Sequence, residues 1–141
     1  MKATPAQMMA RLRRKLKHPT EAVVQREVIV YLRLKGCTIY STSQGYRVEP
    51  GGTRMTPGIP DLLVWFPDGR MGWFEVKPHD GQLLYNRLVT KEAKDVNASS
   101  LKDWKRVQAQ EVFARRCVLG GVPYGRGGLA EAQIFYEVAN G

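Results

Sequence analysis

The segment from Gly58 to Pro78, which reads GIPDLLVWFPDGRMGWFEVKP, has two apolar runs, and three charged residues lie outside the turn that joins them. They are Asp61, Glu75 and Lys77. Charged groups are costly inside a protein core unless something pairs with them. Two carboxylates beside an ammonium can hold a divalent cation that also takes substrate phosphate, or they can form a structural salt-bridge cluster. The residue types alone leave both interpretations open.

The turn between the two apolar runs decides whether these side chains can meet. FPDGR at residues 66–70 matches a three-residue hairpin loop, in which proline and aspartate form a type I turn and glycine takes the left-handed conformation. Counting back along the antiparallel ladder from this loop places Asp61 opposite Glu75. Lys77 is two residues further along the strand and shares the same face. A two-residue loop would move Asp61 to the other face.

Charge is distributed unevenly along the 141-residue chain, which has 22 basic and 13 acidic residues and a formal net charge of +9. Residues 1–17 contain six basic side chains and no acidic one. We therefore divide the chain into a basic N-terminal arm, residues 1–19, and a single domain, residues 20–141. A basic arm indicates a polyanionic partner, with a solubilising tail as the alternative.

Other features of the composition limit the possible location of the protein. No apolar run approaches the ~20 residues that a membrane-spanning helix needs, and the N-terminus lacks a signal-peptide pattern, so we expect a cytoplasmic protein with no membrane partner. Cys37 and Cys117 have apolar neighbours and no metal-ligand spacing, which predicts buried free thiols.

The elements that must position the charged cluster follow from periodicity and turn residues. Thr20 is a good N-cap, Ser100 and Asp103 resemble a capping box, and Gly120 or Gly121 can end the helix that follows. The pattern leaves residues 82–100 without an assignment. It predicts helices at 5–17, 20–36, 100–121 and 129–138, and strands at 37–43, 122–125 and in the two arms of the hairpin. This order indicates an α/β fold, a mixed sheet with helices packed against it.

A glutamine falls on the apolar face of the helix predicted at 100–121. Gln110 belongs to the stripe of Val107, Ala114 and Cys117, which should face the sheet. A polar side chain there must be satisfied, either by the charged cluster or by a hydrogen bond in the core. Gln108 is the competing position.

The motif resembles a known family. GIPD, thirteen further residues and EVK, preceded by a helix with EAVVQ and followed by a helix with a glutamine, resemble the VRR-NUC (virus-type replication-repair nuclease) family of the PD-(D/E)XK nuclease superfamily. The resemblance covers roughly residues 20–125. It implies a restriction-endonuclease-like core, which is a central mixed sheet flanked by helices. It also implies divalent-metal-dependent hydrolysis of DNA phosphodiester bonds in phage or bacterial replication, recombination or repair.

The resemblance assigns roles to residues of this chain. Asp61 and Glu75 would be the main metal ligands, with the backbone carbonyl of Val76 completing the site. Lys77 would orient or help deprotonate the attacking water and offset negative charge on the phosphate. Glu21 would ligate or support the metal. The expected cofactor is Mg²⁺, with Mn²⁺ as a substitute and Ca²⁺ as an ion that binds without supporting cleavage.

Supporting residues implied by the resemblance have simpler explanations too. Gln25 lies one turn after Glu21 on the same helix face and would support the site, although it could equally bond a loop. Glu21, in the first turn of a helix, is also favoured by the helix dipole alone. Glu27 is a weaker rival for the acidic role. Gln110 would be the glutamine of the later helix.

The chain departs from the family pattern in a basic insert at about residues 84–100. The insert could grip a DNA arm, mediate a dimer or be a solvated loop. We expect structure-selective cutting of branched DNA, such as four-way (Holliday) junctions, by a homodimer. The alternatives are a nucleic-acid-binding protein without catalysis and a metal-dependent RNase of the same fold. The side chains expected to contact the DNA backbone are Arg11, Arg13, Arg14, Lys15, Arg47, Arg54, Lys102, Lys105 and Arg106.

Overall fold

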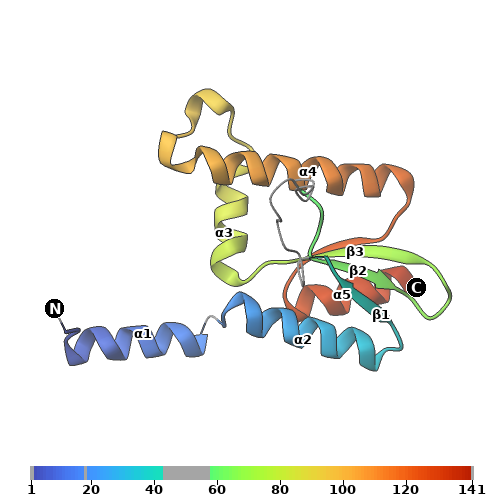
Figure 1. Ribbon diagram of the computed structural model, residues 1–141, viewed down its shortest axis with the longest axis horizontal. Helices are drawn as coiled ribbons and strands as arrows, with labels where there is room; N and C mark the ends of the chain where they lie inside the picture. Colours follow the sequence, from blue (N-terminus) through green and yellow to red (C-terminus); the bar gives the residue numbers. More distant parts are fainter. Residues whose placement is uncertain (1, 18, 43–57, 141) are drawn as a thin grey trace, which may run out of the picture.

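The computed structural model describes residues 2–17, 19–42 and 58–140, except for the side chains of residues 12–17. Within these ranges the chain forms a four-stranded sheet in the order β1-β2-β3-β4, flanked by helices (Figure 1). β1, β2 and β3 are antiparallel neighbours, and β4 is parallel to β3. The predicted α/β class, with a mixed sheet and packed helices, is confirmed.

The described residues form four strands, five α-helices and two 3₁₀ turns. The strands are β1 (Thr38–Ser41), β2 (Leu62–Trp65), β3 (Met71–Val76) and β4 (Tyr124–Gly127). The helices are α1 (Pro5–Lys17), α2 (Glu21–Leu34), α3 (His79–Leu88), α4 (Leu101–Gly120) and α5 (Leu129–Asn140), with 3₁₀ turns η1 (Ala93–Asp95) and η2 (Ala98–Ser100). No helix in the described ranges combines the length and apolar character that crossing a bilayer requires.

The hairpin has the predicted register. Leu62 pairs with Phe74, and the pairing continues without slippage to the turn. The amide of Phe66 donates to the carbonyl of Arg70 at 2.8 Å, which closes a three-residue loop. Gly69 has a φ of 89°, the left-handed conformation that the loop requires. Because side chains alternate along a strand, this register decides which face of the sheet each charged residue occupies.

Two predictions about helix ends have opposite outcomes. Thr20 caps α2 as predicted, because its Oγ1 accepts the amide of Val23 at 3.4 Å. The predicted capping box at Ser100 and Asp103 is wrong, because the Ser100 side chain makes no capping bond. η2 runs directly into α4, so Ser100 has helical φ and ψ of −103° and −1° instead of the extended backbone of an N-cap.

Residues 79–88, part of which the sequence left without an assignment, form α3. Tyr85 and Leu88 lie three residues apart on one side of α3, and both are buried against Val107 of α4. The first part of the predicted insert at 84–100 therefore belongs to a packed helix, and η1 and η2 lie in the remainder.

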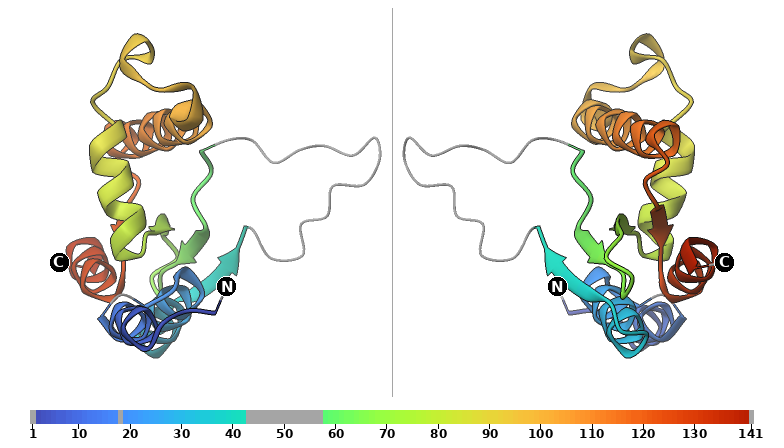
Figure 2. Two further views of the ribbon diagram at one scale, coloured as in Figure 1. Left: turned by 90° about the vertical axis from the view of Figure 1, so that its left-hand side faces the viewer. Right: turned by 90° about the vertical axis from the view of Figure 1, so that its right-hand side faces the viewer.

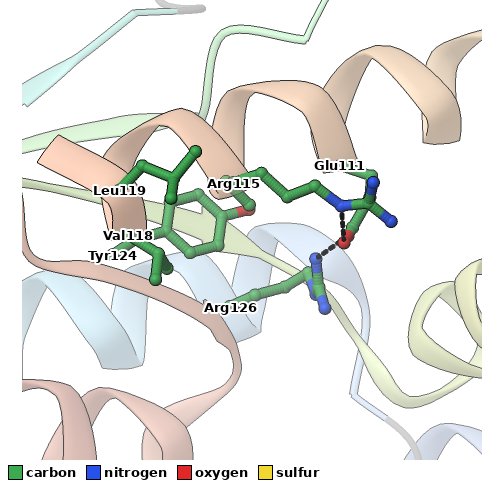
Figure 3. A pocket seen from close by; sticks show the side chains of 7 residues that line it. Glu111, Arg115, Val118, Leu119, Tyr124 and Arg126 are labelled. Carbon is green, nitrogen blue, oxygen red and sulfur yellow. Dashed lines mark hydrogen bonds and ion pairs between the residues drawn. The ribbon is translucent and has the colours of Figure 1, made fainter.

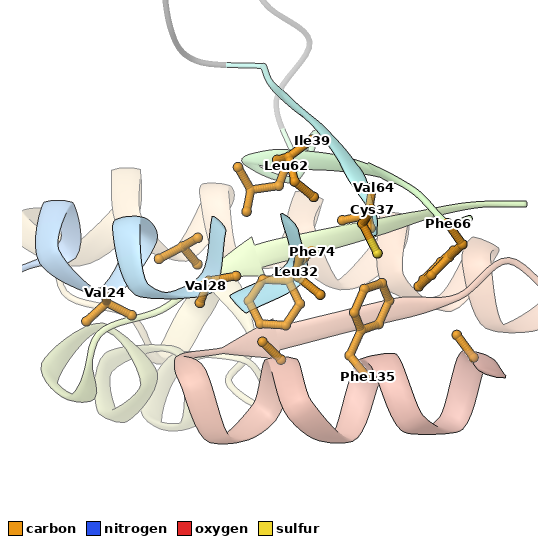
Figure 4. Close-up of a cluster of buried hydrophobic side chains, with 13 residues drawn as sticks. Val24, Val28, Leu32, Cys37, Ile39, Leu62, Val64, Phe66, Phe74 and Phe135 are labelled. Carbon is orange, nitrogen blue, oxygen red and sulfur yellow. The ribbon is translucent and has the colours of Figure 1, made fainter. Parts of the chain in front are cut away.

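The two faces of the sheet are covered by different helices. Figure 2 shows α3 and α4 on one side of the strands and α2 and α5 on the other. The second side contains the main apolar cluster, in which Phe74 of β3 packs with Leu32 of α2 and Phe135 of α5 (Figure 4). Cys37 lies in this cluster and Cys117 faces the sheet from α4; both are free and buried, as predicted. The face toward α3 and α4 is left for the charged residues.

Candidate active site

The backbone around Asp61 is held by its neighbours. Gly58 has a φ of 89°, and a Cβ at this position would lie 2.5 Å from the carbonyl oxygen of Ala109 on α4, so only glycine allows this approach. Thr42 donates its hydroxyl to the carbonyl of Pro60 at 2.7 Å and its amide to that of Asp61 at 2.9 Å. The segment that leads to Asp61 is thus tied both to α4 and to the end of β1.

The Asp61 side chain points across to the end of β3, as the predicted register requires. Its Oδ2 accepts the amide of Val76 at 2.9 Å. Glu75, one residue before Val76, is only 5% exposed and lies on the side of β3 that faces α4. The two carboxylates therefore meet at one end of the sheet.

Gln110 of α4 links Glu75 to Lys77. Its Nε2 donates to Oε1 of Glu75 at 3.2 Å, and its Oε1 accepts Nζ of Lys77 at 2.9 Å. The predicted stripe on α4 is confirmed, since Gln110 is buried and faces the sheet. Gln108 instead donates to the carbonyl of Val89 at 3.0 Å. Gln110 is therefore the glutamine that contacts the charged residues.

The surroundings of Glu75 disfavour the ionised form of its carboxylate. Burial, followed by the negative charge of Asp61, raises the pKa of Glu75 far above its usual range, and Lys77 opposes this only in part. Burial also lowers the pKa of Lys77, against the opposing attraction of Glu75. Oε2 of Glu75 is buried without a hydrogen-bond partner among the described residues. A further positive charge beside Glu75 would favour its ionised carboxylate and give Oε2 a partner.

The charged residues line a common cavity of about 200 Å³. Glu21, the first residue of α2, reaches it, whereas Gln25 is half-buried and is absent from the described lining. Arg106, which was predicted to contact the DNA backbone, also reaches it. The lining residues are Glu21, Asp61, Glu75, Val76, Lys77, Pro78, Gly81, Arg106 and Gln110.

The donor set fits a hard divalent cation. Asp61 and Glu75 supply carboxylate oxygens to a cavity that Val76 also lines, a combination that suits Mg²⁺ with several retained waters. Among the described residues, no three His, Cys, Asp or Glu side chains come close enough together to hold a metal ion. The cavity thus has two closely placed carboxylates, and the role of Glu21 as a ligand stays a prediction.

The residues predicted to contact DNA are only partly described. Arg11 on α1 and Lys102 and Lys105 on α4 are exposed. Arg106 pairs with Asp103 at 3.2 Å while lining the cavity. Figure 1 shows α1 projecting away from the sheet. The side chains of Arg13, Arg14 and Lys15, and the residues Arg47 and Arg54, lie outside the described residues.

Sequence reasoning missed a second layer of the site. Tyr85 of α3 lies beside Lys77, and Arg126 of β4 is paired with Glu75 in the parallel ladder. The helical spacing of Tyr85 and Leu88 could have revealed α3. Arg126 had no comparable local signal, because only the pairing of β4 with β3 brings it to this face.

Comparisons with known proteins found one similar solved structure. No family model matches the chain, and no curated protein matches it. A solved structure titled "VRR_NUC domain" is similar, with 19% identity, a TM-score of 0.48, and coverage of 83% of this chain and 94% of that one. Its title names the family that the motif resembles. At this level of similarity, the function has to rest on the side chains of the site.

Proposed function

We propose that this protein is a divalent-metal-dependent nuclease that hydrolyses phosphodiester bonds of DNA. The observation that supports this most directly is Oε2 of Glu75, a buried carboxylate oxygen without a hydrogen-bond partner among the described residues, next to Asp61. Adjacent buried carboxylates are unfavourable unless a cation joins them. Lys77 supplies one cation, and the cavity leaves room for a second.

Five residues of the cavity have a role in this chemistry. Asp61, Glu75 and the carbonyl of Val76 would hold Mg²⁺, which when bound supplies Lewis acidity at the phosphate oxygens. Lys77 presents a fixed ammonium that orients the attacking water and stabilises charge developing on the phosphate. Gln110 fixes the positions of the Lys77 and Glu75 side chains relative to each other, because it hydrogen-bonds both.

The substrate proposed is a DNA backbone, cut according to its structure rather than its base sequence. Arg106 lines the cavity and the exposed Lys102 and Lys105 precede it on α4, so cations are available for phosphates next to the scissile one. We extend the proposal to branched DNA, including four-way junctions, and to a homodimer, whose two-fold symmetry would match that of a junction. These finer points derive from the resemblance of the motif.

The direct test is cleavage of a panel of linear, flapped and four-way DNAs and their RNA counterparts in Mg²⁺, Mn²⁺ or Ca²⁺. We expect cleavage of branched DNA with Mg²⁺ or Mn²⁺, and binding alone with Ca²⁺. Asp61→Asn should lower the cleavage rate about a thousandfold, roughly 4 kcal/mol of transition-state stabilisation, and should preserve binding in Ca²⁺.

A matched control is available at the tip of the same hairpin. Asp68 pairs with Arg70 at 2.6 Å and is exposed, so Asp68→Asn makes the same chemical change away from the cavity and should leave cleavage unaltered. The proposal fails if the wild-type protein binds DNA but cuts none of the panel, or if Asp61→Asn cuts as fast as the wild type. Preferential cleavage of the RNA versions would reassign the substrate.

A further inference from the structure

We infer that Tyr85 is a positioning residue whose ring, held by Arg126 and Glu111, fixes the ammonium of Lys77 inside the cavity. The inference rests on the proposed nuclease function, because it concerns the same lysine. It assigns a role to three residues from α3, α4 and β4 that the motif does not include.

The contacts of Lys77 leave its position underdetermined without Tyr85. A lysine side chain has four rotatable bonds and a compact charge, so one hydrogen bond, to Gln110, does not define where the ammonium lies. Nζ of Lys77 also lies 5.5 Å from the centroid of the Tyr85 ring, within the range of a cation–π interaction. Amide and ring together give the ammonium two fixed neighbours on different helices.

Tyr85 is itself held firmly. Its side chain is only 2% exposed, and its hydroxyl donates to Oε2 of Glu111. The guanidinium of Arg126 lies 3.7 Å from the ring centroid, and Nη1 of Arg126 is 3.8 Å from the same Glu111 oxygen. Glu111 follows Gln110 directly on α4. The same turn of α4 therefore secures Lys77 through one side chain and Tyr85 through the next.

Figure 3 shows Arg126 extending toward Glu111. Both residues line a cavity of about 430 Å³. Arg126 is paired with Glu75 across the β3–β4 ladder, so it is directed to the face of the active site. Its charge opposes that of Lys77, and it contributes to the lowered pKa of that lysine. An apolar residue would fill this space without burying a guanidinium. The tyrosine and the Arg126–Glu111 pair are better explained by holding a charge in place than by packing.

The test distinguishes the effect of the aromatic ring from the effects of side-chain volume and of the hydroxyl. Tyr85→Phe keeps the ring and loses the bond to Glu111, whereas Tyr85→Leu keeps an apolar side chain and loses the ring. We expect Tyr85→Leu to lower kcat about tenfold, as the loss of a desolvated cation–π contact predicts. The Kd for DNA in Ca²⁺ should stay unchanged, and Tyr85→Phe should retain most of the wild-type kcat, because its ring keeps the contact with Arg126.

The control is a second lysine with aromatic neighbours. Nζ of Lys35 lies 5.8 Å from the ring of Tyr31, on the α2 side of the molecule. Tyr31→Leu removes a comparable contact and should leave kcat unchanged. The inference is overturned if Tyr85→Leu and Tyr85→Phe lose kcat equally, if the loss follows the Kd, or if Tyr31→Leu matches Tyr85→Leu.

A spectroscopic measurement tests the position of Lys77 independently of cleavage. The ε-methylene protons of Lys77 should show a ring-current shift in the NMR spectra of the wild type and Tyr85→Phe, and Tyr85→Leu should remove it. Absence of the shift in the wild type would overturn the positioning role even if DNA is cut. A shift in a protein that cuts no DNA would uphold the geometry and reject the nuclease function instead.

Discussion

The two faces of β3 are built from alternate residues of one strand, yet their buried side chains are in opposite situations. Phe74 has no exposed surface and is enclosed by the apolar residues of α2 and α5 (Figure 4). Glu75, its neighbour, is 5% exposed and retains a buried oxygen without a hydrogen-bond partner among the described residues. Burial alone therefore does not distinguish a residue of the core from a residue of the active site. The difference lies in whether the buried group is satisfied by what surrounds it.

The helices that cover the two faces differ in the same way. α2 and α5 contact the sheet through a continuous apolar cluster, whereas α4 contacts Glu75 and Lys77 through the amide of Gln110. The apolar face supplies the stability that offsets the cost of buried charge on the other face. Substitutions on the two faces should then separate folding from activity.

The largest effect should come from a pair of substitutions three residues apart. Phe74→Ala removes a fully buried ring from the apolar cluster and should lower the free energy of unfolding by about 3–5 kcal/mol. Lys77→Met removes a partly desolvated charge and keeps a long apolar side chain. It should lower cleavage at least about a hundredfold, roughly 3 kcal/mol, with little loss of stability. Urea unfolding and single-turnover cleavage measure the two quantities.

The contrast between the two faces is wrong if Lys77→Met loses stability or if Phe74→Ala loses activity. If Lys77→Met destabilised the fold as much as Phe74→Ala, the charged face would be part of the core. If folded Phe74→Ala lost its cleavage per folded molecule, the apolar face would be part of the site.

A smaller effect should appear as a pH dependence of stability in the absence of divalent cations. Because burial and Asp61 raise the pKa of Glu75, the folded state holds a proton that the unfolded state releases above about 4.5. This contribution is fully present below that value and is lost as the pH rises through the folded pKa. Glu75→Gln removes the dependence, so its Tm should exceed that of the wild type by a margin that grows from about pH 5 to about pH 9.

Thermal unfolding in a chelating buffer measures this margin. Adding Mg²⁺ or Ca²⁺ should raise the Tm of the wild type more than that of Glu75→Gln, because the ion binds the folded carboxylates. A constant margin across the pH range would mean that Glu75 titrates normally, and the contrast between the faces would weaken.

The smallest expected effect concerns cations on the surface of the two helical layers. Arg87 and Lys91 line a polar cavity at the end of α3, while Arg33 and Lys35 lie at the end of α2 on the other layer. Replacing Arg87 and Lys91 by alanine should raise the Kd for DNA several-fold and reduce the salt slope of binding by up to about 2. The Arg33 and Lys35 pair serves as the control and should change neither. Equal effects from both pairs would place DNA on both layers.

The hairpin shows how much of the site a local pattern can predict. The turn at residues 66–70 determines the register, and the register brings Asp61 to the end of β3 near Glu75. Gln110 was likewise predictable, since its helical stripe has a single buried orientation. Ser100 was misassigned because η2 precedes α4 without a break, and a capping pattern contains no information about the turn before it.

By itself the sequence determined the alternation that separates Phe74 from Glu75, because a strand places successive side chains on opposite faces and a short loop leaves one register. Only the tertiary structure decided what surrounds Glu75 and Lys77. Tyr85 and Arg126 reach them from α3 and β4, and their positions depend on how α4 packs over the sheet and returns the chain parallel to β3. Contacts of this kind depend on packing between elements that are distant in sequence, and the spacing of residues within one element does not predict that packing.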